Sequence, residues 1–595
     1  MDGNDGASIE HIDVLIVGGG PVGTVTSFDP YRSYQLARTL PPTSRIKIIE
    51  KHAKSSQDQY GRAITLFPRT SEMLDQLGLA DALAQECFAC RETVSYDKDG
   101  NEVKGRGWAF MEQMKDTKWD FSLVLRQKYQ EEIFREALRK LGVTLEVPVA
   151  LVDVRVDEEV KSPAHRVLAT LEDGLSGERR VLKCRYMVGA DGGRSFVRRA
   201  LNIPFDGSSS EDKWVRIDGV VETDIPRPRS YCAIESPTHG NVLWVALDHG
   251  ATRVGFAFTA QRQAAYDVFD EEAAIKEAIA SVKPFSLNFK QVDWWTIYVV
   301  GQRIARSFSA HDCIFLAGDA CHTHSSGAAQ GMNTGIHDAV NLGWKLSLVL
   351  RRLAEPAILD TYEQERRPNV QKLINYDKDI SRLMTMQLPL GWTGDPHADP
   401  NVVLGEVMAE AATFSSGLGI YYEPDEVLNM IGSLPAPEEH VRRPTPGQRA
   451  PDVDLRQPGT FELTRLHKET PNYARFHVVV FVGDPNQTSS AFAAFASELV
   501  LSTILSSPTV PVGWLTIPAK SHSSAYELLG RKPLGRVFYD PDGAAHQRYG
   551  VDAGKGAIFV LRPDGWVGTA VELKEDAVQE LEAYFSRFLV RESEV

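Results

Sequence analysis

The chain has 595 residues, which is too long for one domain and typical of two to four. Its content of 43% hydrophobic and 24% charged residues is ordinary for a soluble globular protein. The net charge of −15, with no Lys/Arg run to offset it, argues against a nucleic-acid partner. No apolar run is long enough to span a bilayer, and the acidic start is unlike a signal peptide. Six cysteines in this length do not make a disulfide framework, so we expect a reduced, cytoplasmic protein.

The first informative segment is a strand that runs into a glycine-rich turn. Residues 12–17 are apolar apart from one aspartate, as expected for a buried parallel strand, and three glycines follow. Such glycines permit a tight turn, close approach of a pyrophosphate and close packing of the next helix. The second strand should end in an acid that binds ribose hydroxyls, and residues 45–49 lead into one. The residues predicted to bind a dinucleotide here are Gly18, Gly20, Gly23, Glu50 and Lys51.

The spacing inside this unit is abnormal. Between Gly23 and Glu50 lie 26 residues, several more than the usual distance of about 20. Asp29-Pro30 interrupts what should be a helix, and a helical pattern resumes over residues 34–40. We interpret residues 24–33 as an insertion at the mouth of the site, either genuine or an error of the gene model, and expect it to be dispensable.

A second nucleotide signature lies almost three hundred residues further on. The apolar run 314–317 leads into Gly318-Asp319, and after a loop a helix is predicted from Gly331 through residue 345. A carboxylate can accept hydrogen bonds from sugar hydroxyls, and backbone N–H groups at a helix start can hold negative charge. This arrangement suits a ribityl and pyrophosphate clamp, for which the candidate residues are Gly318, Asp319, Gly331, Met332 and Asn333.

With the segments 61–72 and 186–198, these motifs make the chain resemble the single-component flavin aromatic hydroxylases of the phenol hydroxylase family. The resemblance implies FAD as cofactor, NADPH or NADH as transient reductant, and O₂ as co-substrate. It also implies that Arg62 contacts the flavin pyrophosphate, Gln127 the adenosine side and Asp319 the ribityl chain. Asp191 would serve both FAD and the passing nicotinamide nucleotide.

The resemblance implies an α/β fold of the p-hydroxybenzoate hydroxylase type. A Rossmann-like FAD-binding domain would be interleaved with an antiparallel-sheet substrate domain, and a thioredoxin-like domain would follow. The strand-like runs at 230–235, 241–247 and 253–258 suit the antiparallel sheet. We expect FAD-binding segments at 1–200 and 306–385, the substrate sheet at 201–305, a linker at 386–445, and the last domain at 446–595. That last domain contains no cysteine, which excludes redox catalysis there and leaves a packing or homodimer role.

Several residues allow a second reading. Cys87 and Cys90 have redox spacing but follow a helical pattern, so we interpret them as structural thiols. Cys321, His322 and His324 offer too few ligands for a metal site, and none is expected. Tyr298 lies in an aromatic, strand-like run and would read as core packing on its own. In the phenol hydroxylase family the matching tyrosine lies beside the substrate hydroxyl, so we assign Tyr298 a catalytic role in the pocket.

Two departures from the family pattern concern the site itself. The family has an aspartate that helps to deprotonate the phenol, and here that position is Ile64. In the flavin loop, Ser326 and Ala329 stand where the family shows Pro and Gly. General-base help is worth about 10²–10⁴-fold, so its loss should change either the substrate or the base.

The resulting prediction is a monooxygenase that hydroxylates a small phenolic substrate through a flavin C4a-hydroperoxide. One alternative keeps the flavin and gives Baeyer–Villiger, decarboxylative or dearomatising oxidation of a polyketide-like phenol. Another is a flavin-binding protein without oxygenase activity, because both the insertion and the loop changes touch the site.

Overall fold

The first sheet is built around a strand that is buried on both faces. In β1 (Glu10–Val17) the last six residues are all buried, which confirms the parallel strand expected at 12–17. The structure is a computed structural model that describes residues 9–26, 45–57, 62–104, 106, 108, 111–112, 114–143, 145–160, 164–325, 327, 329–424, 428–431 and 443–590.

Parallel pairing extends on both sides of β1. It pairs with β2 (Ile46–Ile49) and β11 (Arg179–Gly189), and β18 (Ile314–Leu316) joins the far side of β11. The order is β17-β18-β11-β1-β2-β8, in which β17 is Ser309–Ala310 and β8 is Leu145–Glu146. Since β18 comes from the distant second signature, the chain does return to the nucleotide fold as predicted.

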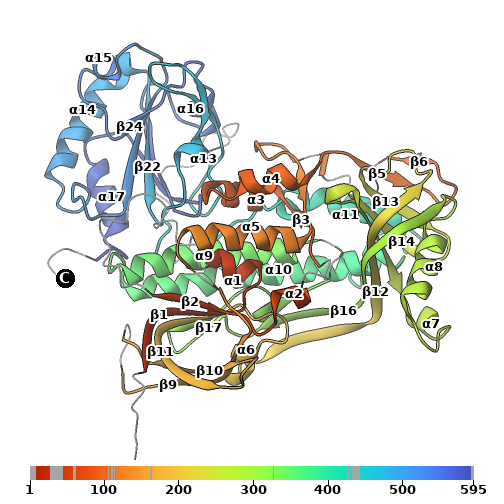
Figure 1. The fold of residues 1–595 in the computed structure, drawn as a ribbon. Helices are drawn as coiled ribbons and strands as arrows, with labels where there is room; N and C mark the ends of the chain where they lie inside the picture. Colours follow the sequence, from red (N-terminus) through yellow and green to blue (C-terminus); the bar gives the residue numbers. More distant parts are fainter. Residues whose placement is uncertain are drawn as a thin grey trace, which may run out of the picture.

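Two long helices run through the centre of the molecule (Figure 1). They are α9 (Gly331–Leu350) and α10 (Thr361–Met384). The short helix α1 (Pro21–Thr26) lies against α9, because Gly318 and Gly335 leave space for Val22. A Cβ atom at either glycine would be 2.8 or 2.6 Å from Val22 Cγ2.

The start of the predicted insertion belongs to the nucleotide fold. Thr24 is fully buried inside α1, and its hydroxyl donates to the carbonyl of Gly20 at 2.9 Å. The prediction that 24–33 can be removed as a unit is therefore wrong for Thr24–Thr26, which continue the helix after the glycine turn. Residues 27–33 and the helical pattern at 34–40 lie outside the described residues.

The second sheet is antiparallel over the expected strands. β12 (Phe205–Thr223) pairs with β16 (Leu287–Ala305) and with β15 (Thr252–Phe258). The sheet continues through β14 (Gly240–Ala246) and β13 (Tyr231–Ser236), which confirms the antiparallel pairing predicted for these strand-like runs. It also recruits three short strands from elsewhere, which are β5 (Thr93–Tyr96), β6 (Glu102–Val103) and β19 (His322–Thr323).

The two faces of this sheet have different covers. Helix α8 (Glu271–Ser281) packs against the back face, where Val254, Phe256 and Trp244 lie. Helices α10 and α11 (Pro400–Glu410) pack against the front face. The front face is the one that turns toward the nucleotide fold through Arg253, whose Nη1 donates to the carbonyl of Arg62 at 2.6 Å.

The segment 386–445, expected to be a linker, contains α11 and the short helix α12 (Ala412–Ser415). Asp399-Pro400, which lies within the segment expected to be a linker, is a helix start. Asp399 caps α11 by accepting from the N–H of Asn401 at 2.9 Å, and Pro400 occupies the first turn. Composition alone could not separate these two uses of Asp and Pro.

The last domain contains a five-stranded sheet in the order β24-β23-β22-β25-β26. Its central strand, β22 (Phe476–Gly483), is buried throughout. The outer strands are β24 (Arg536–Val537), β23 (Val512–Pro518), β25 (Ala557–Leu561) and β26 (Val567–Glu572). Helices α14 (Pro485–Leu501) and α17 (Ala577–Phe585) cover one face, and α13 (Leu466–Glu469) and α16 (Ala544–Arg548) the other. This confirms the predicted α/β unit, which Figure 1 shows as a blue lobe beside the nucleotide fold.

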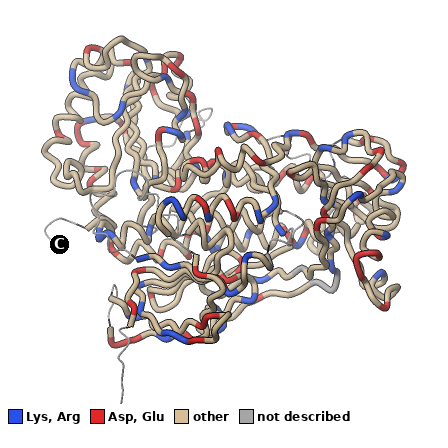
Figure 2. Tube along the Cα trace, viewed as in Figure 1, with Lys and Arg blue, Asp and Glu red and all other residues tan. Residues whose placement is uncertain are grey.

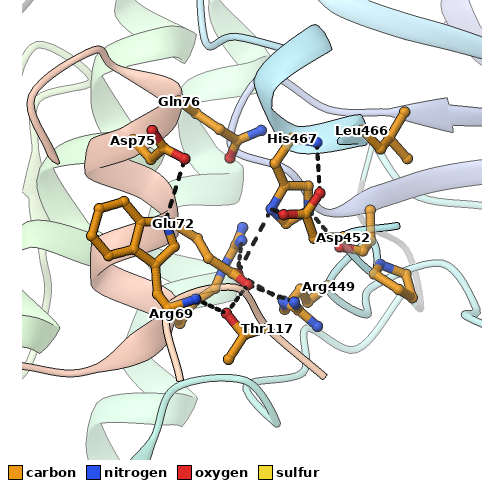
Figure 3. A network of polar contacts seen from close by, with 12 residues as sticks. Arg69, Glu72, Asp75, Gln76, Thr117, Arg449, Asp452, Leu466 and His467 are labelled. Carbon is orange, nitrogen blue, oxygen red and sulfur yellow. Dashed lines mark hydrogen bonds and ion pairs between the residues drawn. The ribbon is translucent and has the colours of Figure 1, made fainter. Parts of the chain in front are cut away.

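A buried ionic cluster joins this domain to the rest of the chain (Figure 3). Arg69 and Glu72 lie on α3 (Pro68–Gln76), and both are fully buried. Arg449 donates to both oxygens of Glu72, at 2.7 and 2.5 Å. Arg69 donates to Glu72 at 2.8 Å and to the carbonyl of Asp564 at 2.6 Å. Residues almost four hundred positions apart thus share one polar network.

Charge is otherwise mixed along the chain. Figure 2 shows Lys and Arg interspersed with Asp and Glu over all parts of the trace, without a basic stripe. Among the described residues, no helix is both long and apolar enough to cross a membrane.

Candidate active site

A groove of about 320 Å³ opens where the parallel strands of the first sheet end. β1, β2, β11 and β18 all terminate here, and ligands of open α/β sheets bind at this edge. Seven of the predicted cofactor residues line the groove: Gly18, Gly20, Glu50, Lys51, Arg62, Asp191 and Asp319.

Gly18, Gly20 and Gly23 each lack a side chain for a different steric reason. Gly18 has φ +114°, and a Cβ there would be 2.2 Å from the carbonyl oxygen of Ala190. A Cβ at Gly23 would be 2.0 Å from the carbonyl oxygen of Gly18, so this glycine lets α1 pack on the turn. A Cβ at Gly20 would meet nothing within 4 Å, and Gly20 borders the groove. That open space beside the turn is where a pyrophosphate needs room.

Two carboxylates in the groove lining, Glu50 and Asp191, accept hydrogen bonds from backbone N–H groups. Glu50 accepts from the N–H of Gly19 at 3.0 Å and of His52 at 2.9 Å. Asp191 uses only Oδ2, which accepts from the N–H of Phe196 at 2.6 Å and of Val197 at 3.2 Å. Oδ1 of Asp191 is buried without a partner among the described residues. A buried acceptor beside an open groove fits a cofactor that brings hydroxyl donors.

Asp319 is the exposed member of the clamp. It follows Gly318, whose φ of +61° suits glycine, in the short turn Gly318–Ala320. The turn is fixed from behind by Asp338 of α9, which accepts from the N–H of Gly318 at 3.0 Å. Asp338 was not singled out as a site residue by the sequence, because its partners His322 and Arg366 lie 16 and 28 positions away.

This buried aspartate anchors a charged cluster behind the groove. The Asp338 carboxylate forms hydrogen bonds with His322 Nε2 at 2.8 Å and with Arg366 Nε at 2.7 Å. Burial alone would raise the pKa of Asp338, but the Arg366 guanidinium and His322 lower it to about 2. Cys321, His322 and Asp338 come within metal-binding distance of one another. The buried Arg366 cation and the occupied carboxylate oxygens disfavour a second cation there, so the cluster is better explained as an ion pair.

The remaining predicted cofactor residues lie outside the groove lining. Gln127 begins α5 (Gln127–Lys140), and its side-chain amide donates to Glu131 at 2.8 Å. Gly331, Met332 and Asn333 form the first turn of α9, whose N–H groups are free of intrahelical partners by geometry. The Asn333 side chain accepts from the N–H of Phe67 at 2.8 Å and donates to the carbonyl of Thr65 at 2.9 Å. It therefore joins the segment after Arg62 to the first turn of α9.

The front face of the antiparallel sheet carries an apolar group that we call the front-face cluster. It brings together three residues that the sequence singled out separately: Tyr298, Ile64 and Ala329. Further members come from the sheet and from helices α10 and α11, among them Trp214, Tyr231, Leu243, Met384 and Leu404.

Tyr298 is the polar member of this cluster. It is half-buried on β16, and its hydroxyl lies 3.3 Å from Nη2 of Arg216. Burial raises the pKa of Tyr298, and the nearby Arg216 cation offsets part of that rise. Ile64 is only 5% exposed and offers no proton acceptor from its side chain.

The six cysteines are all free thiols. Burial raises the pKa of both Cys87 and Cys90 to about 11, so neither thiol is ionised at neutral pH. This supports the structural reading of that pair.

Comparisons with known proteins agree with this geometry. Residues 11–377, more than half of the chain, match the family described as FAD binding domain. Residues 502–593 match the phenol hydroxylase C-terminal dimerisation domain. Phenol 2-monooxygenase of Aspergillus fumigatus is 28% identical over 596 residues, which cover 95% of each chain. 3-Hydroxybenzoate 4-monooxygenase of Comamonas testosteroni is 28% identical over 627 residues, 97% of this chain and 95% of the relative.

Solved structures share the fold. Aklavinone-11 hydroxylase, crystallised with FAD and aklavinone, superposes with a TM-score of 0.70 at 21% identity, covering 98% of this chain and 99% of the other. The groove at the strand ends suits a dinucleotide, and the match to the FAD binding domain family identifies the protein as a flavoprotein. The chain belongs to the FAD-binding domain family and is a flavin-dependent aromatic monooxygenase of the phenol hydroxylase group.

Proposed function

We propose that this chain hydroxylates a phenolic ring that binds against the front-face cluster with its oxygen at Tyr298. NADPH or NADH would reduce the flavin transiently, and O₂ would be the second substrate. The observation that carries the proposal is the position of the Tyr298 hydroxyl. It is a polar group on an apolar face, and that face is joined to the cofactor groove through Arg253 and Arg62.

The groove residues suit FAD, and each has a definite task. The turn at Gly18, Gly20 and Gly23 would accept the pyrophosphate, Glu50 the ribose, and Asp191 and Asp319 the hydroxyls of the ribityl side. Once bound and reduced, FAD supplies the oxygen-activating chemistry that protein side chains lack. The protein has to orient the ring, exclude water and control the phenol proton.

Proton control differs from the family pattern because Ile64 replaces an acid. Tyr298 can orient the phenol oxygen, but a neutral hydroxyl with a raised pKa is a poor base at neutral pH. Substrates that ionise easily should therefore react best.

A panel of phenols tests the proposal. Purified holoenzyme is mixed with NADPH and each phenol, and NADPH oxidation, O₂ uptake and product structure by mass and NMR are recorded. We expect stimulated oxidation and a ring-hydroxylated product, with acyl-substituted phenols ahead of unsubstituted phenol, because a conjugated carbonyl group stabilises the phenolate. If no phenol gives an oxygenated product, the proposal is wrong. A ring-expanded or decarboxylated product would favour the alternative oxidations instead.

We further propose that the protein is a homodimer held by its last domain, since residues 502–593 match a family described as a dimerisation domain. Light scattering on the full chain should give twice the monomer mass. A monomer at micromolar concentration would contradict this.

A further inference from the structure

A buried arginine lies on the front face next to Tyr298. Arg216 is 5% exposed and lies on β12, two residues after Trp214, so both side chains point to the same face. Trp214 is the register partner of Tyr298. The guanidinium carbon of Arg216 is 5.4 Å from the Trp214 ring and 5.8 Å from the Tyr298 ring. The cation is thus held between two aromatic rings, within reach of the tyrosine hydroxyl.

A glycine on the neighbouring strand makes room for this side chain. Gly255 of β15 is the register partner of Arg216. A Cβ at position 255 would lie 1.9 Å from Nη1 of Arg216 and 2.8 Å from its Cδ. The guanidinium can lie flat across the sheet only because residue 255 has no side chain. Any alanine there would displace it.

The charged groups around this position are largely engaged with one another. Asp218, next on the same face of β12, holds Arg253 through two hydrogen bonds of 2.7 and 2.8 Å. Asp377 of α10 accepts from the N–H of Ser325 at 2.7 Å and from Gln302 at 2.8 Å. Both carboxylates therefore support neighbouring loops and strands, and Arg216 donates from Nη2 to the Tyr298 hydroxyl at 3.3 Å.

We propose that Arg216 and Tyr298 form an anion-binding pair that recognises the substrate as its phenolate. This inference rests on the proposed function and names the ionic form that the site accepts. In a water-poor apolar site, a fixed guanidinium stabilises a nearby phenolate relative to the neutral phenol. Such a cation lowers the pKa of the bound phenol, and the phenol proton is released to water as the phenolate binds, so no protein side chain has to accept it. The role left vacant by Ile64 is then filled by charge stabilisation in place of proton abstraction.

The proposal is tested by measuring which ionic form binds. 4-Nitrophenol is the probe, because its phenolate absorbs visible light and its neutral form does not. Holoenzyme is titrated with the probe across a pH range that brackets the probe's own pKa, and the difference spectrum reports the phenolate. For wild type we expect the pKa of the bound probe to fall by about one unit or more, since that corresponds to a tenfold preference for the anion.

Variants assign the effect to Arg216. Arg216→Gln should abolish the pKa shift of the bound probe and weaken phenolate binding about tenfold or more. Arg216→Lys should retain part of the pKa shift, because the lysine keeps the positive charge. Gly255→Ala keeps the arginine but displaces it, and should resemble Arg216→Gln; it also serves if the latter does not fold. Arg227→Gln, an exposed arginine that pairs with Glu102, is the matched control and should behave as wild type.

The outcomes separate this inference from the proposed function. Binding of neutral 4-nitrophenol, no binding of the probe, or an unchanged phenolate affinity in both Arg216→Gln and Gly255→Ala would each overturn the role of Arg216. Hydroxylation of phenols could still hold in those cases. Failure of the whole phenol panel with an intact phenolate preference would overturn the proposed reaction alone.

Discussion

Tyr298 is the residue on which coupling of oxygen to the ring should depend. Tyr298→Phe keeps the ring in the front-face cluster but removes the hydroxyl that would orient the phenol oxygen. NADPH oxidation should survive while the yield of hydroxylated product per NADPH falls about tenfold or more, because a positioned hydrogen bond aligns the reacting carbon. Product and hydrogen peroxide are measured together. Tyr96→Phe, on the back face of the same sheet, is the control and should stay coupled. Unchanged coupling in Tyr298→Phe would remove Tyr298 from the mechanism.

Ala329 is strained where it meets the same cluster. Its φ is +53°, a left-handed conformation that costs an L-residue about 1–2 kcal/mol. Ala329→Gly should therefore raise the free energy of unfolding by up to about 1 kcal/mol after the added flexibility of glycine is counted. Thermal unfolding of the holoenzyme measures this. Ala317→Gly, at an extended position with φ −140°, should be destabilising, and equal effects in both variants would contradict the strain argument.

At the scale of elements, substitutions at two glycines of the turn should have different effects, one on cofactor binding and the other on folding. Gly20→Ala places its methyl group in open space, so the protein should fold normally while FAD affinity drops, because the new methyl group borders the groove. Gly23→Ala places it 2.0 Å from a backbone carbonyl and should give little folded protein. Flavin content and soluble yield are compared for the two variants. A folded Gly23→Ala with full flavin, or a fully loaded Gly20→Ala, would show that the turn is not the pyrophosphate site.

Elements marked by local pattern were predictable, and those made by distant contacts were not. The β1 strand and its turn were predictable because burial on both faces leaves an apolar run followed by glycines. Helix α11 was missed because Asp399-Pro400 serves equally well as a loop or a helix start. The Asp338–Arg366 pair behind Asp319 was missed because nothing in either local sequence specifies a partner 28 residues away.

At the scale of the whole molecule, the family resemblance carried by the motifs implied a nucleotide fold interleaved with an antiparallel sheet, followed by a further α/β unit, and the structure has these parts. The junction with the last domain was not predictable, since Glu72 and Arg449 are 377 residues apart. The same holds for the front-face cluster, where Ile64, Tyr298 and Ala329 meet only after three chain segments fold together. The family resemblance pointed to Ile64, Tyr298 and Ala329 one at a time, and the folded structure shows that the three pack in one cluster.

At the junction with the last domain, a substitution that removes one buried charge should lower the stability of the protein strongly. Glu72→Gln leaves the buried guanidinium groups of Arg69 and Arg449 without their shared anion (Figure 3). Breaking a buried ion pair from one side costs about 3–5 kcal/mol. Glu72→Gln should therefore lower the thermal midpoint and expose the domain junction to limited proteolysis. Asp454→Asn, which removes an exposed junction pair with Lys118, should cost less than about 1 kcal/mol. Similar losses in the two variants would show that the buried cluster does not hold the domains together.

The last domain should also make the protein sensitive to mild acid. Burial lowers the pKa of His477 to about 4, and its Nε2–H donates to the carbonyl of Pro471 at 2.9 Å. Above pH 6.5 this histidine is neutral in both the folded and the unfolded chain. As pH falls from about 6.5 to about 4, the unfolded chain takes up the proton first, so stability is lost across that window.

The size of this loss for His477 is about 3 kcal/mol, since each unit of pKa difference is worth about 1.4 kcal/mol. His239 and His337 also have pKa values lowered by burial, so they add to the slope in the same direction. His477→Gln keeps a donor for Pro471 and should reduce the proton uptake on unfolding by up to one, which flattens unfolding midpoints measured between pH 4 and 6.5. His522→Gln, at the exposed surface of the same domain, should leave the slope as in wild type. An equal slope in wild type and His477→Gln would mean that His477 is protonated as readily in the folded chain as in the unfolded one.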